Sequence, residues 1–330
     1  MTIPSVRTIK AETDRTLRRA NDPRKVILAY AGITVLLAAL LTGANALLSE
    51  RIADTGGLAN FGLRSVLSTA QSVLPMIQSV ALLCLEFGYL HAILRISRGQ
   101  YADHTDLKVG FHRFGPIVRL TILQYFLFFG ITMMLFYLSM QIFLMTPLAD
   151  PLVDLLTPFV TLAGSDAAAL MDEALMNQAL SMMMPLLIIY GIVCCLVLIP
   201  LFYRFRMAKY VLLDDPNGRA FAALRTSARM MKRNGIRLFR LDLSFWWYFG
   251  LIALATGISY GDAILPMLGI ALPFSETLGF YLFYALYLAM LFAIYYFLRN
   301  PVEVAYAKAY DALRDKPADN GVVLGNIFDM

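Results

Sequence analysis

Long apolar runs alternate with shorter polar stretches along the whole chain. Six runs have about the 20 residues that a helix needs to cross the hydrocarbon core of a bilayer. They cover residues 26–48, 73–94, 117–145, 185–205, 238–258 and 277–298. Backbone groups in lipid must be hydrogen-bonded within the chain, and these runs are too long and too evenly apolar for barrel strands. We therefore predict an all-α fold, a polytopic transmembrane bundle of six spanning helices within residues 26–298.

The two ends of the chain are polar and basic. Residues 1–25 are expected to form a short surface helix that ends at Asn21-Asp22-Pro23, because proline disfavours helix in the residue before it. Residues 299–330 are expected to be a polar tail. The composition, 59% hydrophobic and 15% charged, agrees with this division, since soluble domains have about 25% charged residues. An ordinary soluble domain is therefore excluded.

Two short amphipathic helices are predicted in the connections. One lies near residues 106–115 and is broken at Gly115-Pro116, and the other covers residues 216–233. The second follows Asp214 and Asp215, whose charges suit a helix N-terminus, and stops at Asn234-Gly235. Both are expected to lie at the membrane surface.

The basic residues fall almost entirely on one side of the predicted bundle. If all six runs span, 26 of the 28 Lys and Arg residues lie in the terminal segments, in the second and fourth connections, or at the ends of the runs that face these connections. Only Arg51 and Arg64 fall on the other side. By the positive-inside rule, both termini and both basic connections are predicted to be cytoplasmic.

Three of the cytoplasmic segments resemble one another. Residues 17–28, 111–120 and 230–241 each contain a basic amphipathic stretch, a helix breaker and further basic residues before an apolar run. One interpretation is a repeat of three helical hairpins, each preceded by a cytoplasmic interfacial helix. The alternative is that any inward end of a spanning helix collects basic residues.

The predicted helix at 216–233 separates apolar from basic positions. Its apolar residues Phe221, Leu224, Ala228 and Met231 follow helical spacing. A basic amphipathic helix at the inner leaflet attracts anionic headgroups, with about 1 kcal/mol for each basic residue near the surface. The candidates for binding lipid or a protein partner are Arg225, Arg229, Lys232, Arg233 and Arg113. The simpler alternative is that these charges only set the topology and anchor the helix.

Three polar residues inside the apolar runs are further candidates: Glu86, Gln124 and Asp242. Ionisable groups in lipid are costly, so an intramembrane acid such as Glu86 is a functional candidate by default. The alternative for Glu86 is a structural contact with a tyrosine, with Gln124 or with a basic residue near the inner face. Asp242 is interpreted as a local ion-pair partner of the neighbouring Arg237 and Arg240.

A family resemblance rests on Asp215-Pro216, on residues 227–234 and 239–247, and on the Gly110–Gly115 segment. At these positions the chain resembles bacterial six-helix integral membrane proteins of unknown function, which are similar in turn to the membrane-anchor domain beside some glycerophosphodiester phosphodiesterases. The resemblance covers about residues 86–254. It implies a location in the bacterial cytoplasmic membrane and supplies no activity.

The sequence favours a non-enzymatic role. Catalytic motifs, dinucleotide loops and metal-ligand spacings are missing from it, and we expect no cofactor and no nucleic-acid partner. The first hypothesis is a scaffold or accessory factor that engages anionic lipid or a protein partner through its basic face. The alternative is a transporter or permease-like protein for a small or lipidic substrate, indicated by Glu86 and the glutamines in the runs. The substrate, the partner and the oligomeric state are left open.

Overall fold

The computed structural model describes residues 3–20, 23–54, 61–147, 149–150, 173–215, 218–267 and 275–314. In these ranges the regular secondary structure is helical, without a strand, which confirms the all-α prediction for them. The chain divides into two compact units. Met1–Arg119 and Met207–Met330 form the first unit, and Leu120–Arg206 form the second.

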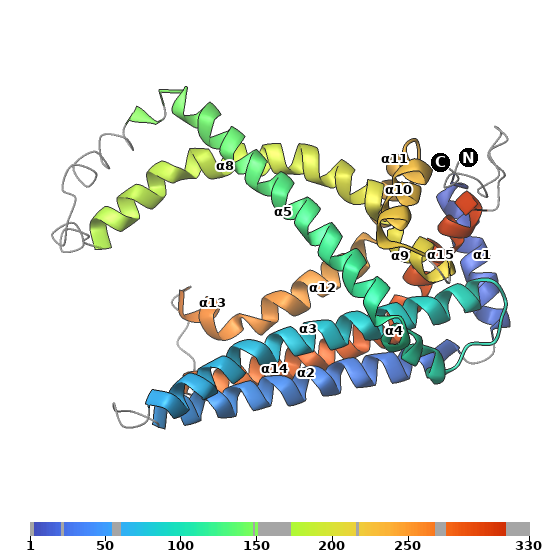
Figure 1. Cartoon of the computed structure of the whole chain (residues 1–330), viewed down its shortest axis with the longest axis horizontal. Coiled ribbons are helices and arrows are strands. Elements are labelled where there is room, and N and C mark those ends of the chain that lie inside the picture. The colour runs from blue at the N-terminus through green and yellow to red at the C-terminus, as the bar shows by residue number, and fades with distance from the viewer. Residues whose placement is uncertain are drawn as a thin grey trace, which may run out of the picture. The chain divides into compact units, whose positions relative to one another are not determined.

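The first unit contains most of the helices (Figure 1). In chain order they are α1 (Val6–Arg19), α2 (Pro23–Asp54), α3 (Phe61–Ser97), the 3₁₀ turn η2 (His104–Lys108), α4 (Val109–His112), the first turns of α5 (Phe114–Leu144), α9 (Ala208–Asp214), α10 (Ala220–Met231), α11 (Gly235–Leu243), α12 (Trp246–Ser259), α13 (Gly261–Met267), α14 (Glu276–Ile294), the π-helical turn η3 (Tyr295–Arg299) and α15 (Asn300–Arg314).

Three long helices of this unit lie side by side. α2 packs along α3, and α14 packs against both α2 and α12 (Figure 1). At one end of this layer α15 packs against α1 and α3. The residues of α15 are the best buried of any helix there, with Val304, Ala305, Ala307, Ala309 and Leu313 completely covered. The core of the unit is therefore concentrated at the α1–α15 end.

Two glycines set a very close crossing in the first unit. A Cβ atom on Gly88 of α3 would lie 2.1 Å from the carbonyl oxygen of Leu107, and one on Gly110 of α4 would lie 1.8 Å from the carbonyl oxygen of Cys84. Any side chain at either position would displace the facing backbone. These two glycines therefore let the η2–α4 segment rest directly on α3.

Five helical stretches are long and apolar enough to cross a membrane, and their length and composition indicate a membrane protein. They are Pro23–Ala53, Gly62–Ser97, Phe114–Leu144, Ser181–Asp214 and Leu278–Arg314. A sixth crossing is reached if α11 and α12 are counted together, although the two are bent by 66°.

The second unit contains the rest of α5 and α8 (Glu173–Phe205). Phe143, Ala149 and Leu186 form its small core, and Phe136 meets Tyr190 edge to face with 5.5 Å between the ring centroids. Many apolar side chains elsewhere on both helices are exposed, as is typical of helices that face lipid. They include Tyr125, Phe126, Met134, Tyr137, Ile188 and Leu196.

The predicted fifth span at 238–258 is wrong as a single straight helix. α11 ends at Leu243 and α12 begins at Trp246. The Ser244 hydroxyl donates to the Leu241 carbonyl at 2.6 Å, and Lys10 of α1 donates to the Ser244 carbonyl at 3.0 Å. A serine that bonds back along its own helix bends it, and the bond from Lys10 occupies a carbonyl of the helix ladder. The bend thus coincides with a contact between residues that are 234 positions apart in the chain.

The predicted surface helices are present with shifted ends. The N-terminal helix is α1, but Asn21 and Asp22 lie outside the described residues, as does Pro216 at the predicted start of the 216–233 helix. That helix is α10 and begins only at Ala220, while Asp214 ends α9 instead of starting α10. The break predicted at Gly115-Pro116 lies at Arg113, so that Pro116 stands in the first turn of α5, where proline is tolerated.

Other boundaries also move outward. α3 begins at Phe61, twelve residues before the span predicted from 73, and α8 begins at Glu173, twelve residues before the span predicted from 185. The segment predicted as a tail from 299 begins with the buried helix α15, which the sequence analysis missed. The rest of the predicted tail, from residue 315 onward, lies outside the described residues. Residues 151–172, between α5 and α8, also lie outside them.

Candidate functional site

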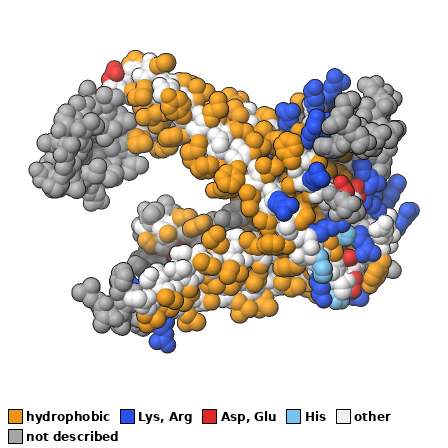
Figure 2. All heavy atoms as spheres, viewed as in Figure 1, with side chains coloured by type: hydrophobic (Ala, Val, Ile, Leu, Met, Phe, Trp, Pro, Cys, Tyr) orange, Lys and Arg blue, Asp and Glu red, His pale blue; other side chains and the backbone are white. Residues whose placement is uncertain are grey.

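Lys and Arg side chains of the first unit gather at the end where α1, α10 and α15 lie (Figure 2). Here the last residues of α1, α3, α9 and α15 meet. Helix C-termini carry a partial negative charge that basic side chains stabilise. We call this region the basic end and describe it outward from Arg98, which follows the last residue of α3.

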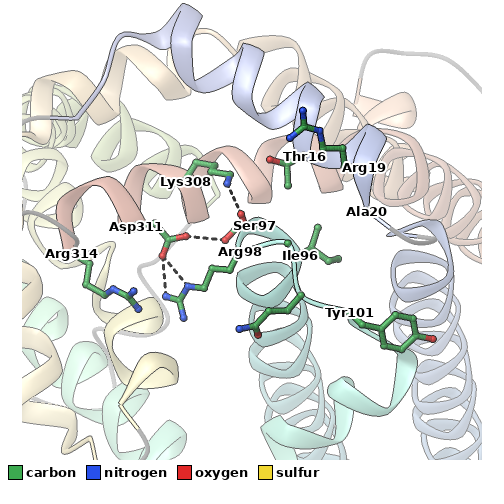
Figure 3. Close-up of a pocket in the computed structure, with 12 residues that line it drawn as sticks. Thr16, Arg19, Ala20, Ile96, Ser97, Arg98, Tyr101, Lys308, Asp311 and Arg314 are labelled. Atoms are coloured by element: carbon green, nitrogen blue, oxygen red, sulfur yellow. Dashed lines mark hydrogen bonds and ion pairs between the residues drawn. The ribbon is translucent and has the colours of Figure 1, made fainter.

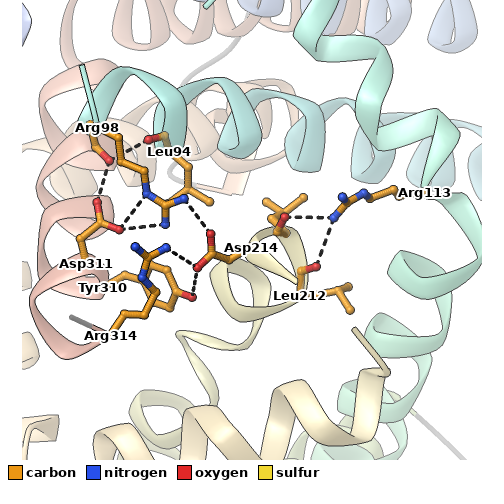
Figure 4. Close-up of polar contacts among 10 residues, drawn as sticks. Leu94, Arg98, Arg113, Leu212, Asp214, Tyr310, Asp311 and Arg314 are labelled. Carbon is orange, nitrogen blue, oxygen red and sulfur yellow. Dashed lines mark hydrogen bonds and ion pairs between the residues drawn. The ribbon is translucent and has the colours of Figure 1, made fainter. Parts of the chain in front are cut away.

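Arg98 links three parts of the chain (Figure 4). Its Nη1 donates to Asp214 Oδ1 at 2.7 Å, and its Nε and Nη2 donate to Asp311 Oδ1 at 3.1 and 2.9 Å. Asp214 Oδ2 also accepts from Arg314 at 2.7 Å and from the Tyr310 hydroxyl at 3.0 Å. The Arg98 network therefore holds α3, α9 and α15 together.

The same network keeps Arg98 protonated. Burial alone would lower the pKa of its guanidinium, but the hydrogen bonds to Asp214 and Asp311 outweigh that effect. The pKa of Arg98 consequently lies above its ordinary value. Arg98 acts here as a permanent positive charge.

The helix ends around Arg98 are capped. Gly99, with φ of 73°, donates to the Ile96 carbonyl at 3.0 Å, and Gln100 donates to the Arg95 carbonyl at 2.9 Å, which is a Schellman motif. Lys308 of α15 donates to the next free carbonyl, that of Ser97. Arg113 donates to the Leu213 carbonyl at the end of α9 at 3.0 Å. The candidate Arg113 therefore caps a helix, and a guanidinium suits that position.

Two cavities flank the Arg98 network. The larger has a volume of about 810 Å³ and lies between the end of α1, the end of α3 and α15 (Figure 3). The smaller, of about 390 Å³, is lined by Arg98, Arg113 and Asp214 among others. Both are polar hollows at the basic end of the molecule.

Four basic candidates, two on α10 and two directly after its last residue, lie away from the packed face of the helix. Leu224, Ser227 and Met231 are buried, and α10 packs against α9. Phe221, the first residue of the predicted apolar stripe, is 69% exposed. The exposed basic residues are Arg225, Arg229, Lys232 and Arg233. Within the described part of the chain, none of the four has an acidic partner.

The intramembrane candidates have separate surroundings. Glu86 Oε1 accepts a hydrogen bond from Lys209 Nζ at 2.8 Å, so its contact is with a basic residue, one of the alternatives left open. Gln124 is half-buried on α5 in the second unit. Asp242 is buried and accepts from the Tyr306 hydroxyl of α15 at 2.7 Å, a partner that the sequence analysis did not foresee.

Arg299 was not singled out from the sequence. It is 7% exposed, and its guanidinium carbon lies 4.5 to 5.2 Å from the ring centroids of Tyr30, Tyr89 and Tyr295. Its Nε lies 3.8 Å from Glu303 Oε1 and has no hydrogen bond within the described residues. The π-helical turn η3 ends at Arg299, and such turns often mark functional positions. Its only sequence signal was a basic residue directly after an apolar run.

Comparisons with known proteins place the chain in a family. A family model described as "Protein of unknown function (DUF975)" matches residues 8–303, so the chain belongs to the DUF975 family. The resemblance to an uncharacterised family is confirmed, whereas a link to phosphodiesterase anchor domains is not shown. No curated protein and no solved structure matches. Within the described residues, no group of three His, Cys, Asp or Glu side chains could hold a metal ion.

Proposed function

We propose that this member of the DUF975 family is a non-enzymatic six-span protein of the bacterial cytoplasmic membrane that binds anionic lipid headgroups through α10. In this proposal both termini lie in the cytoplasm. The protein acts as a scaffold or accessory factor, and its basic end also offers a surface to a protein partner.

The topology is supported by helix length and by charge. Five helices meet the criteria for a membrane span, and the bent α11–α12 pair supplies the sixth crossing that places 26 of 28 basic residues on one side. Reporter fusions should alternate between periplasm and cytoplasm, starting with periplasm. The fusion points are Leu48, Arg98, Ala163, Lys232, Pro266 and Pro317. A periplasmic reporter at Lys232 would contradict the topology.

The observation that carries lipid binding is the division of α10 into two faces. Its apolar face packs onto the protein, while Arg225, Arg229 and Lys232 project outward without acidic partners among the described residues. Unpaired guanidinium and ammonium groups at a membrane surface are available to phosphate oxygens of lipid. If these basic residues served only to keep this segment on the cytoplasmic side of the membrane, they would not need to lie together on one exposed face.

The proposal is tested by native mass spectrometry of the full chain released from nanodiscs that contain phosphatidylglycerol. The test variant changes Arg225, Arg229 and Lys232 to Gln. The matched control changes three exposed basic residues of α1, Arg7, Arg15 and Arg18, to Gln, which removes the same charge. Lipid retention should fall in the α10 variant and stay near the wild-type level in the control. Equal retention in both would contradict the proposal.

The internal repeat fits this arrangement. The hairpins α2–α3, α5–α8 and α12–α14 would each follow a surface element, namely α1, η2–α4 and α10–α11. α2 with α3 and α12 with α14 are packed pairs, which supports two of the three hairpins. We extend the proposal to a shared six-span architecture with the phosphodiesterase anchor domains.

Transport is the alternative function, and one observation favours it. Two acid–base pairs, Glu86–Lys209 and Arg299–Glu303, lie within stretches that qualify as spans. Ionisable groups at such positions often line pathways for substrates or ions. We favour the lipid-binding function because each acid here faces a cation. Uptake of a candidate solute into proteoliposomes that depends on Glu86 would favour transport instead.

A further inference from the structure

We propose that the larger cavity at the basic end binds a phosphate group with two negative charges, such as a phosphate monoester. The cavity is separate from the basic face of α10, since none of its lining residues belongs to α10. Its basic residues come from three elements: Arg19 from α1, Arg98 from the segment after α3, and Lys308 and Arg314 from α15 (Figure 3).

The charge of the cavity wall is unbalanced. Four cations line it, against Asp311 among the lining residues and the adjacent Asp214, which pairs with Arg98 and Arg314, so that two positive charges are in excess. A surplus of positive charge around a polar hollow attracts multiply charged anions more than singly charged ones. A phosphate monoester therefore fits this wall better than the diester of a common phospholipid.

Several hydrogen-bond donors of the wall have no partner among the residues that the structure describes. The exposed Arg19 contacts no acid among the described residues, and its guanidinium has five N–H donors. Lys308 has three donors and gives one to the Ser97 carbonyl. Arg98 gives three to Asp214 and Asp311 and keeps two. Phosphate oxygens are suitable acceptors for such groups.

The nearby helix C-terminus does not compete for these donors. The last carbonyl oxygens of α3 already accept hydrogen bonds from the backbone of Gly99 and Gln100 and from the Lys308 ammonium, so their hydrogen-bonding needs are met within the protein. The cavity of about 810 Å³ also has the size of a small-molecule site. The remaining donors can thus turn toward a bound anion.

The phosphate group has two sources, a soluble monoester or the headgroup of phosphatidic acid. The soluble source is tested by titrating the purified full chain in detergent with glycerol 3-phosphate and following the thermal unfolding midpoint. The lipid source is tested in phosphatidylcholine nanodiscs with and without phosphatidic acid. A saturable rise of the midpoint with either probe supports the site and identifies the source. No rise with either probe overturns it.

Two neighbouring arginines give a matched pair of variants. Arg19→Gln should weaken binding of the active probe on the order of tenfold, because it removes charged hydrogen bonds to the ligand. Arg18→Gln removes the same charge from the same helix turn but does not line the cavity, so binding should stay unchanged. Among the described residues, Arg19 has no ion pair whose loss would affect folding. Equal effects of both variants, or none for Arg19→Gln, would overturn the proposal.

The phosphate site in the cavity can be tested separately from the proposed binding of lipid by α10. The α10 variant with Arg225, Arg229 and Lys232 changed to Gln should keep glycerol 3-phosphate binding, and the phosphatidic acid binding that remains in it should fall further when Arg19 is also changed to Gln. Loss of glycerol 3-phosphate binding in the α10 variant, or no effect of Arg19→Gln on its remaining phosphatidic acid binding, would overturn the cavity as the site.

Discussion

Lys209 and Glu86 form an ion pair with 2.8 Å between Nζ and Oε1, although 123 residues separate them in the chain. Lys209 stands in the second position of α9, and Glu86 stands in the C-terminal third of α3. Each side chain is about one third exposed to the surroundings of the protein, at 35% and 32%. The pair thus connects α9 to α3 within the first unit.

Removing one member of this pair should destabilise the protein. Glu86→Gln leaves the Lys209 ammonium without its carboxylate, and we expect a loss of roughly 1–3 kcal/mol, between the values for exposed and buried pairs. The double variant Glu86→Gln with Lys209→Met should recover part of the loss, because no charge is then left unpaired. Unfolding in detergent at increasing SDS concentration measures both. Neutral single variants would mean that the pair has no structural role.

The glycine crossing predicts a large effect from a single methyl group. Gly110→Ala would place a Cβ 1.8 Å from the Cys84 carbonyl oxygen, so the backbone must move. We expect a loss of about 3 kcal/mol or more, the upper range for overpacking. Gly115→Ala is the control, because nothing lies within 4 Å of its Cβ position. It should be neutral or stabilising by up to about 1 kcal/mol. Equal unfolding midpoints for the two variants would contradict the crossing.

The Arg98 network predicts a similar contrast between two neighbouring acids. Asp214→Asn weakens the contacts of a carboxylate that is 17% exposed to both Arg98 and Arg314 and should cost about 1–3 kcal/mol, between the values for exposed and buried pairs. Asp215→Asn changes the exposed neighbour and should cost less than about 1 kcal/mol. Chemical unfolding of both variants in detergent measures the difference. The network would lose its role if Asp215→Asn were the more damaging change.

The spanning helices could be predicted from the sequence because lipid imposes a simple rule on composition. Runs such as 117–145 need only be long and apolar, and the helix α5 follows within three residues of that range. The basic face of α10 was visible for a similar reason, since helical spacing alone separates Leu224 and Met231 from Arg225 and Arg229. These features are local.

The network and the bend could not be predicted because they depend on contacts between distant segments. Asp214 looked like a helix start, but its extended successor Asp215 ends α9, and its partners come from α15. At the bend between α11 and α12, the Ser244 carbonyl accepts a hydrogen bond from Lys10, which lies 234 residues away in the chain. Arg299 looked like the first residue of a tail, and only the fold places Tyr30 and Tyr89 over it. The spacing of residues along the sequence does not indicate which distant residues come into contact.

The bend predicts that α11 lies in the headgroup layer while α12 crosses the bilayer. Ile236, Phe239 and Leu243 are exposed on one helical face, and Trp246 follows at the bend, 69% exposed. Tryptophan favours the membrane–water interface. Trp247→Phe leaves Trp246 as the single tryptophan of the chain. Its fluorescence should be quenched more by lipids brominated near the headgroups than by lipids brominated near the chain ends. The reverse order would contradict the interfacial placement.

The central claim is that the exposed basic face of α10 binds anionic headgroups, and a lipid titration across salt concentrations tests it most directly. Displacement of fluorescent phosphatidylglycerol is measured in nanodiscs for the wild type and for the Arg225, Arg229 and Lys232 to Gln variant. With about 1 kcal/mol for each charge, the variant should bind on the order of a hundredfold more weakly at low salt. The difference in affinity between the wild type and the variant should become smaller at 1 M salt, where the Debye length falls to about 3 Å. Equal affinity of the two proteins at low salt would contradict the claim.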